Sequence, residues 1–262
     1  MLRALLAFTY RKRLPARFGG ARVRVTPRAD ARLLRRGWEG IARDLMLVAD
    51  RMVRPGDAVW DIGANQGIFA FLAAYRAGPG GAVRALEADP AYADMAFRSA
   101  AALGPSYAPV EVLCAAIADA PGVLLFAVSS RGHARSHLVG HGGGDAAPPA
   151  AAIRSVVAVT GDGLLAHWPA PALVKIDVEG AELAALEGCA RLLRDVRPVL
   201  YVEVSERNAD AVTARLRAAG YALGDLQGDG SVRPAPRCTF HTVAWPEERG
   251  DPAARAQSAT RV

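Results

Sequence analysis

Two glycines and two acidic residues stand where apolar strands meet helix-forming segments. The run Asp57-Ala-Val-Trp-Asp-Ile-Gly-Ala-Asn-Gln-Gly67 leads an apolar strand through Asp61 into a glycine turn, and the next apolar run ends in Glu87. Glycine lets the backbone bend tightly and approach a ligand. A helix that begins there offers unpaired N–H groups. An acid at the next strand end can bind ribose hydroxyls. The spacing therefore predicts the nucleoside-binding half of a doubly wound sheet.

The composition of the turn indicates which nucleoside is bound. A pyrophosphate-binding turn reads G-x-G-x-x-G, but Gly63-Ala-Asn-Gln-Gly67 lacks the middle glycine. Asp61 would also place negative charge where a pyrophosphate would lie. An acid there favours a cationic ligand such as the amino and sulfonium groups of S-adenosylmethionine. We predict that Asp61, Gly63 and Gly67 surround its methionine end, with a polar contact from Asn65 and with Glu87 on the ribose. An NAD(P)-dependent oxidoreductase and a non-catalytic protein that binds S-adenosylmethionine remain as alternatives.

A second charged motif follows a later apolar strand. It reads Lys175-Ile-Asp-Val-Glu-Gly-Ala-Glu182, so its charges fall at the carboxyl end of the strand, where open α/β sheets bind ligands. Lys175 and Asp177 share a face of the strand. A buried lysine needs a partner, and Asp177 or Glu203 could provide it. We predict functional roles for Asp177 and Glu179 beside the predicted S-adenosylmethionine site. Glu182 is expected to complement the dipole in the first turn of the next helix.

Apolar segments with alternating strand and helix periods predict an α/β fold around these motifs. The expected strands of a seven-stranded sheet are 57–62, 82–87, 110–117, 174–178, 199–204, 221–226 and 238–245, the last two antiparallel to each other. The expected helices are 37–53, 66–77, 90–103, 181–194 and 208–219. Residues 110–117 and 123–128 are expected to form an inserted hairpin, residues 129–150 an irregular loop, and 155–160 a further strand.

Length and composition fit one domain. The chain has 262 residues, of which 52% are hydrophobic, enough for a buried core. Its three cysteines are scattered and odd in number, which favours buried thiols in a reducing cytoplasm over disulfides or zinc. No run reaches the roughly 20 apolar residues of a membrane helix, and the short apolar start lacks a signal-peptide cleavage site. We expect a cytoplasmic protein, with no indication of its oligomeric state.

The net charge of +6 is unevenly distributed. Residues 1–36 hold ten arginines and Lys12 against the single acid Asp30, whereas the remaining chain is mildly acidic. We divide the chain into a basic N-terminal arm (1–36), a domain (37–246) and a loose tail (247–262). The arm could contact an anionic membrane surface through an amphipathic start. We favour a simpler explanation: the chain contains thirty arginines and only two lysines, so the basic arm reflects a general use of arginine. Aromatic residues are not interleaved with the charges, so no nucleic-acid partner is expected.

Four motifs in this order and spacing resemble the FkbM-type methyltransferases, over roughly residues 38–245. They are Asp61-Ile-Gly-Ala-Asn-Gln-Gly67, Glu87-Ala-Asp-Pro90, Lys175-Ile-Asp-Val-Glu-Gly-Ala-Glu182 and Arg197-Pro-Val-Leu-Tyr-Val-Glu203. The resemblance implies a class I, Rossmann-like methyltransferase fold, S-adenosylmethionine as cofactor, and methylation of a hydroxyl on a polyketide, sugar or similar secondary metabolite. Ala88 stands where family members usually carry proline. Residues 129–150 match poorly, and we expect them to help select the acceptor.

A hydroxyl acceptor must lose a proton, so a nearby base would contribute to the reaction. The candidates are Asp177, Glu179 and His137, although a solvated loop histidine would explain His137 equally well. We predict no metal site. The adenine is expected near Ala116 at the end of the third strand, with Asp119 as a partner for its amino group.

Overall fold

The computed structural model describes residues 8–129, 136–140 and 150–250. Residues 1–7, 130–135, 141–149 and 251–262 lie outside this description. These segments contain most of the predicted amphipathic start, most of the predicted loop 129–150 and most of the predicted tail.

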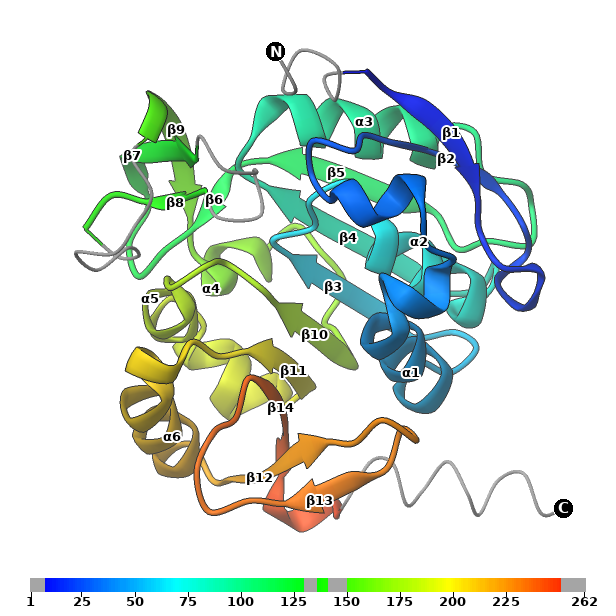
Figure 1. Cartoon of the computed structure of the whole chain (residues 1–262). Coiled ribbons are helices and arrows are strands. Elements are labelled where there is room, and N and C mark those ends of the chain that lie inside the picture. The colour runs from blue at the N-terminus through cyan, green and yellow to red at the C-terminus, as the bar shows by residue number, and fades with distance from the viewer. Residues whose placement is uncertain (1–7, 130–135, 141–149, 251–262) are drawn as a thin grey trace, which may run out of the picture.

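Within the described residues, eight strands form one mixed sheet in the order β13-β12-β14-β11-β10-β3-β4-β5 (Figure 1). The strands from β5 to β11 run parallel, and the last three pair antiparallel. Their bounds are β3 (Ala58–Ile62), β4 (Ala82–Glu87), β5 (Val110–Cys114), β10 (Leu173–Ile176), β11 (Val199–Glu203), β12 (Tyr221–Leu226), β13 (Val232–Pro234) and β14 (His241–Pro246). The predicted α/β sheet with an antiparallel edge is confirmed, and the short β13 adds an eighth strand to the predicted seven.

Helices cover both faces of this sheet (Figure 1). One face carries α1 (Arg43–Met52), α2 (Ile68–Ala77) and α3 (Pro90–Ala100), and the other carries α4 (Gly161–Leu164), α5 (Glu182–Glu187) and α6 (Ala209–Ala218). The helix predicted over 181–194 is divided into α5 and the π-helical η6 (Leu192–Val196). No helix in the described part of the chain is long and apolar enough to cross a membrane.

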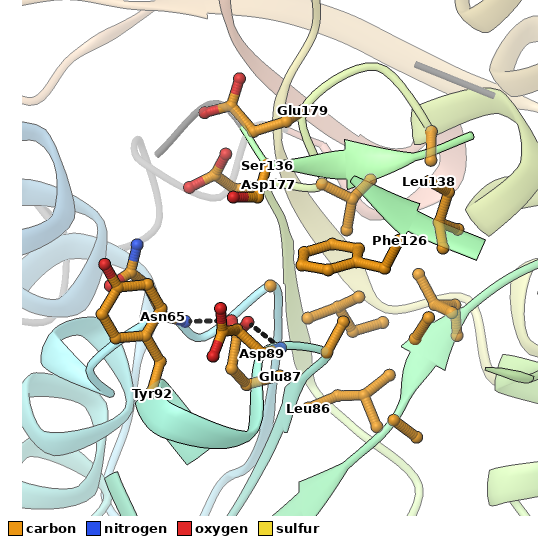
Figure 2. Close-up of a pocket in the computed structure, with 18 residues that line it drawn as sticks. Asn65, Leu86, Glu87, Asp89, Tyr92, Phe126, Ser136, Leu138, Asp177 and Glu179 are labelled. Atoms are coloured by element: carbon orange, nitrogen blue, oxygen red, sulfur yellow. Dashed lines mark hydrogen bonds between the residues drawn. The ribbon is translucent and has the colours of Figure 1, made fainter. Parts of the chain in front are cut away.

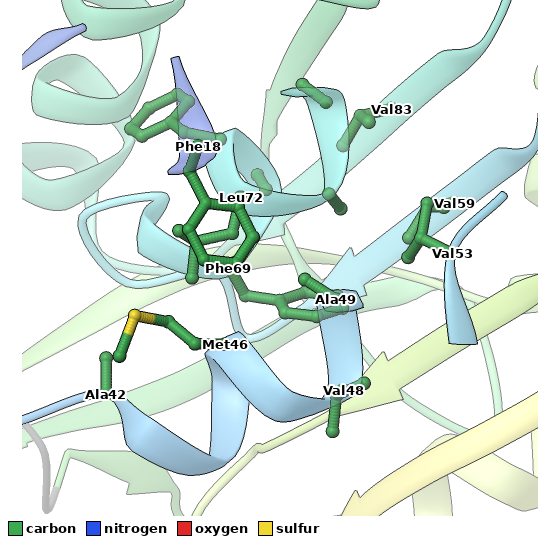
Figure 3. Close-up of a cluster of buried hydrophobic side chains, with 14 of the residues drawn as sticks. Phe18, Ala42, Met46, Val48, Ala49, Val53, Val59, Phe69, Leu72 and Val83 are labelled. Carbon is green, nitrogen blue, oxygen red and sulfur yellow. The ribbon is translucent and has the colours of Figure 1, made fainter. Parts of the chain in front are cut away.

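Alternating strand residues divide the core into two layers. Val59 packs with Met46, Phe69 and Leu72 on the α1 and α2 side (Figure 3), whereas its neighbour Trp60 faces the opposite cluster. The indole of Trp60 meets Trp168 edge-on, with ring centroids 5.3 Å apart. The sheet is therefore buried on both faces, as the near-continuous apolar strands predict.

The basic N-terminal segment packs onto the domain from residue 10 onward. Strands β1 (Tyr10–Arg13) and β2 (Arg22–Val25) form an antiparallel hairpin that buries Phe18. A helix at the amphipathic start, which the spacing of Leu2, Leu5, Leu6 and Tyr10 allows, therefore does not include Tyr10. Hydrogen bonds from Arg24 N to Ser99 Oγ (2.8 Å) and from Thr26 N to Gln66 Oε1 (2.5 Å) join the segment to α3 and to the glycine turn. The short helical turns η2 (Ala16–Phe18), η3 (Ala31–Leu34) and η4 (Trp38–Gly40) lead into α1.

A second, four-stranded sheet stands apart from the main one, at the upper left of Figure 1. Its order is β6-β9-β7-β8, with β6 (Ala116–Ile117), β7 (Gly122–Ser129), β8 (His137–Leu138) and β9 (Ala150–Val159). The predicted hairpin of 110–117 with 123–128 is wrong, because β7 pairs with β9 instead. The chain leaves the main sheet at Ala115, and β9 lies between β6 and β7.

Other local predictions need smaller corrections. Helix α2 begins two residues later than predicted, because Gly67 adopts the left-handed conformation with φ of +81°. Cys114, expected to be buried, is exposed at the end of the edge strand β5, whereas Cys189 and Cys238 are buried. Of the predicted tail, residues 247–249 form η8 (Glu247–Arg249), where Glu248 pairs with Arg197 at 2.7 Å.

Candidate functional site

A cavity of about 100 Å³ opens at the carboxyl ends of β3, β4 and β10, against the second sheet (Figure 2). We call it the donor cavity. Its polar lining comes from Asn65, Glu87, Asp89, Tyr92, Ser136, Asp177 and Glu179, and its apolar lining includes Ile62, Leu86, Ala115, Ala116, Ile117, Phe126, Leu138, Val178 and Ala181. Both motifs found in the sequence therefore meet at one site.

Glu87 is the most constrained carboxylate of the donor cavity. It is buried, and its two oxygens accept hydrogen bonds from Asn65 N (2.6 Å) and Asp89 N (2.7 Å), drawn in Figure 2. Burial raises the pKa of Glu87 to about 7, although both backbone N–H groups oppose the shift. Each oxygen keeps a further lone pair, so the carboxylate can still accept bonds from ribose hydroxyls.

The backbone around the donor cavity is held in uncommon conformations. Asn65 and Glu179 are non-glycine residues with positive φ, +52° and +48°, and both line the cavity. Such strain collects at functional sites. Gly63 also has positive φ, and a Cβ there would lie 1.8 Å from the carbonyl oxygen of Asp177. Gly63 is thus required for the close approach of the two strand ends, in addition to any contact with a ligand.

Asp61 is not exposed to the donor cavity, contrary to its predicted role beside the methionine end. It is fully buried, accepts a hydrogen bond from Ala70 N (3.0 Å) and lies 3.1 Å from Lys175 Nζ. Lys175 also donates to Gly63 O (2.8 Å) and pairs with Asp177 at 3.4 Å. Burial alone would lower the pKa of Lys175, but the charges of Asp61 and Asp177 raise it. Lys175 therefore stays charged and fixes the carboxylate of Asp177, the partner predicted from the strand face.

Glu203, the other predicted partner, forms no ion pair with Lys175. It ends β11 next to the Lys175 strand, where burial and then the charge of Asp177 raise its pKa to about 8. Glu203 therefore holds its proton more tightly than an ordinary glutamate.

The wall opposite Glu87 comes from the second sheet. Phe126 on β7, Ser136, and Leu138 on β8 face the cavity (Figure 2), and none was predicted as a site residue. The alternation of apolar residues in the sequence predicted a strand at Phe126 but not its place in a cavity wall. That place depends on the pairing of β7 with β9, which involves distant residues. Asp89 was also missed, although the sequence Asp-Pro signals a helix start: Asp89 caps α3 by accepting from Ala91 N at 2.8 Å.

Besides Asp61, three predicted residues lie outside the lining. The position of a Cβ on Gly67 faces Phe71 and Ala96 in the core. Asp119 is exposed beyond the end of β6, so it does not reach the adenine side of the cavity that Ala116 lines. His137 is half-buried within β8, between two lining residues but not itself in the lining.

The charges of the donor cavity match a cationic ligand. Among the described residues that line it, Glu87, Asp89, Asp177 and Glu179 are acidic, and none is basic. Basic side chains outside the lining pair with these acids, Arg154 with Asp89 at 3.8 Å and Lys175 with Asp177 at 3.4 Å. This lining would repel a pyrophosphate and attract an amino or sulfonium group. Fold and site together define a nucleoside-binding α/β protein whose ligand carries positive charge.

Residues 61–223 match the methyltransferase FkbM domain, and the chain belongs to this family. It is a methyltransferase that depends on S-adenosylmethionine, and the residues present fit this donor: Glu87 for the ribose, the apolar wall for the adenine, and the other acidic side chains of the lining for the cationic end. The family match confirms the predicted resemblance and gives no support to an NAD(P)-dependent oxidoreductase. A comparison with curated protein sequences gives no match.

Several solved structures are similar to the chain at low identity. The FkbM methyltransferase from Methylobacillus flagellatus KT is 16% identical over 74% of this chain and 48% of its own, with a TM-score of 0.48. The precorrin-6y C5,15-methyltransferase from Geobacter metallireducens GS-15 is 16% identical over 78% of this chain and 87% of its own, with a TM-score of 0.46. An S-adenosylmethionine-dependent O-methyltransferase from Thermotoga maritima is 13% identical over 78% of this chain and 64% of its own, with a TM-score of 0.44.

Proposed function

We propose that the protein transfers the methyl group of S-adenosylmethionine to a hydroxyl oxygen of a small molecule, such as a polyketide, a sugar or a related secondary metabolite. The observation that carries this proposal is the position of Asp177. Its partly exposed carboxylate lines the donor cavity and is held by the buried Lys175 at 3.4 Å. A hydroxyl acceptor needs such a group, because the oxygen loses its proton as it gains the methyl group.

The residues of the chain would divide the work. Glu87 and the apolar wall bind and orient the donor, which supplies an electrophilic methyl group when bound. Asp177 accepts the hydroxyl proton at a carboxylate oxygen, and Lys175 keeps that carboxylate in place. Fixed alignment of this kind can contribute about 7–11 kcal/mol to lowering a barrier.

Glu179 is the second candidate for the base. It lines the same cavity from the turn after β10, and its positive φ holds it there. Asp177 is favoured because the ion pair with the buried Lys175 fixes the position of its carboxylate at the end of β10. His137 is the weakest of the three predicted bases, since it does not line the cavity.

Isotope-labelled donor tests the proposal. The protein is incubated with S-adenosylmethionine carrying a ¹³C-methyl group and a panel of polyols, sugars, phenols and hydroxylated macrolides. We expect a ¹³C signal in the methoxy region for at least one hydroxyl acceptor. Labelled N-methyl or C-methyl products from matched amine and enolisable acceptors, without methoxy product, would contradict it. Tight binding of S-adenosylhomocysteine without product from any acceptor would favour a non-catalytic binding protein.

A further inference from the structure

A second cavity, of about 160 Å³, lies on the other side of Asp177 from the donor cavity. We call it the aliphatic cavity. It is enclosed by the segment that leads into α1 and by the start of α2, with Leu33, Ile41, Leu45 and Ile68 among its walls. Ala42 and Phe69 also belong to the lining, and Figure 3 shows them where it meets the core between α1 and α2.

Asn65 and Asp177 line both cavities. Asp177 follows β10 directly, and Asn65 lies in the turn after the adjacent strand β3, so the two residues form the boundary between the spaces. A molecule in the aliphatic cavity would thus present its end to the same carboxylate that lines the donor cavity. This is the arrangement that a two-substrate transfer requires, because the reacting groups must meet at a shared boundary.

The walls of the aliphatic cavity indicate what it binds. They are largely alkyl side chains, which favour an apolar body. Its cation, Lys175, is already paired with Asp61 and Asp177, and the nearby Arg32 is paired with the lining residue Asp30 at 2.8 Å. Within the described lining no basic group is left to bind a phosphate or carboxylate, and Asp177 would repel one.

The cavity is built from a segment that is firmly attached. Thr26 N donates to Gln66 Oε1 at 2.5 Å, and Trp38 Nε1 donates to Arg13 O at 2.6 Å. The first bond holds the segment over the glycine turn and the second joins two parts of the segment, so the space beneath it has a defined shape. Preorganised walls reduce the entropy that a bound ligand loses.

We propose that the aliphatic cavity is the acceptor site and that the acceptor is an uncharged alcohol with an apolar body, its hydroxyl placed at Asp177. This inference rests on the proposed function. It assigns to the N-terminal segment the selection of the acceptor, which the sequence suggested for residues 129–150.

Straight-chain alcohols from butanol to decanol serve as probes, in the full-length protein with ¹³C-labelled isoleucine and leucine methyl groups. We expect saturable shifts of the Ile41, Leu45 and Ile68 methyls, with affinity rising about fourfold for each added methylene until the cavity is filled. The shifts should persist when S-adenosylhomocysteine saturates the donor cavity. Hexanoate should bind at least tenfold more weakly than hexanol.

Two variants separate the sites. Leu45→Trp, at a partly buried position, should lower alcohol affinity at least tenfold and leave S-adenosylhomocysteine binding unchanged, which also reports that the variant is folded. Glu87→Gln should show the reverse pattern. Alcohol shifts that disappear with S-adenosylhomocysteine, hexanoate that binds as well as hexanol, or no saturable shift would overturn the acceptor site. A protein that fails to bind S-adenosylhomocysteine would instead overturn the proposed function.

Discussion

The two cavities that meet at Asp177 differ in the number of acidic side chains that line them. The donor cavity gathers four carboxylates at the strand ends, whereas the aliphatic cavity is walled mainly by alkyl side chains from α1, α2 and the segment before them. The four carboxylates attract a cationic donor to the first cavity, and the alkyl walls favour an uncharged alcohol in the second. In the proposed arrangement, one strand end serves two substrates without a second domain.

Removing the Asp177 carboxylate, which lines both cavities, should have the largest effect on activity. In Asp177→Asn we expect kcat to fall about 10²–10⁴-fold, because an amide cannot take the hydroxyl proton. S-adenosylhomocysteine affinity, measured by isothermal titration, should change much less than kcat. Glu179→Gln is the matched control, with a smaller loss. A larger loss in the control would transfer the role of base to Glu179.

The buried ion pair between Lys175 and Asp61 should contribute mainly to the stability of the fold. Lys175→Met leaves the fully buried Asp61 without its partner, which we expect to cost about 3–5 kcal/mol in the free energy of unfolding. The loss should shrink at low pH, where Asp61 takes up a proton. Denaturant unfolding measures it, and the double variant Asp61→Asn with Lys175→Met should recover part of the stability. Equal stability of wild type and Lys175→Met would show that Asp61 needs no partner.

Donor affinity should depend on pH through Glu87. Burial raises the pKa of Glu87 to about 7, and only the ionised carboxylate accepts bonds from two ribose hydroxyls. Below pH 7, S-adenosylhomocysteine affinity should therefore fall by up to tenfold per pH unit, with proton release on binding. Glu87→Gln should bind about 10–100-fold more weakly at pH 8, the loss expected for bonds to a charged group, and should lack this dependence.

The stability of the free protein should respond to Glu87 in the opposite direction. The folded-state pKa of about 7 lies above the ordinary value of 4.5, so the folded state binds more protons between these values. The contribution of Glu87 to stability is then present at low pH and lost as pH rises toward 7. Urea unfolding of wild type and Glu87→Gln across this range measures it; a wild-type contribution that grew with pH would contradict the assignment.

The wall from the second sheet should give the smallest effect. Phe126→Ala removes an aromatic ring from the adenine side of the donor cavity, and S-adenosylhomocysteine affinity should fall about two- to tenfold. Val123→Ser on the same strand, at a position 70% exposed, is the matched control and should bind normally. An equal loss in both variants would indicate that β7 acts only through folding of the second sheet.

Much of the fold could be predicted because its signals are local. Strand β4 was predicted with both of its observed ends, and Glu87 falls at the site because the carboxyl ends of parallel strands share one edge. The long-range pairings were less accessible. The choice of β9 as the partner of β7 depends on a strand that begins more than twenty residues later, so Phe126 and Leu138 gave no sign of lining a cavity.

The amino-acid sequence by itself determined the order of the seven longer strands of the main sheet, the family, the donor and the acids at the strand ends, because each follows from neighbouring residues and their spacing. Only the tertiary structure decided that Asp61 is buried with Lys175, that Asp177 borders two cavities, and that the basic segment packs over the glycine turn. Burial and pairing depend on which distant side chains share a space, and no local pattern carries that information.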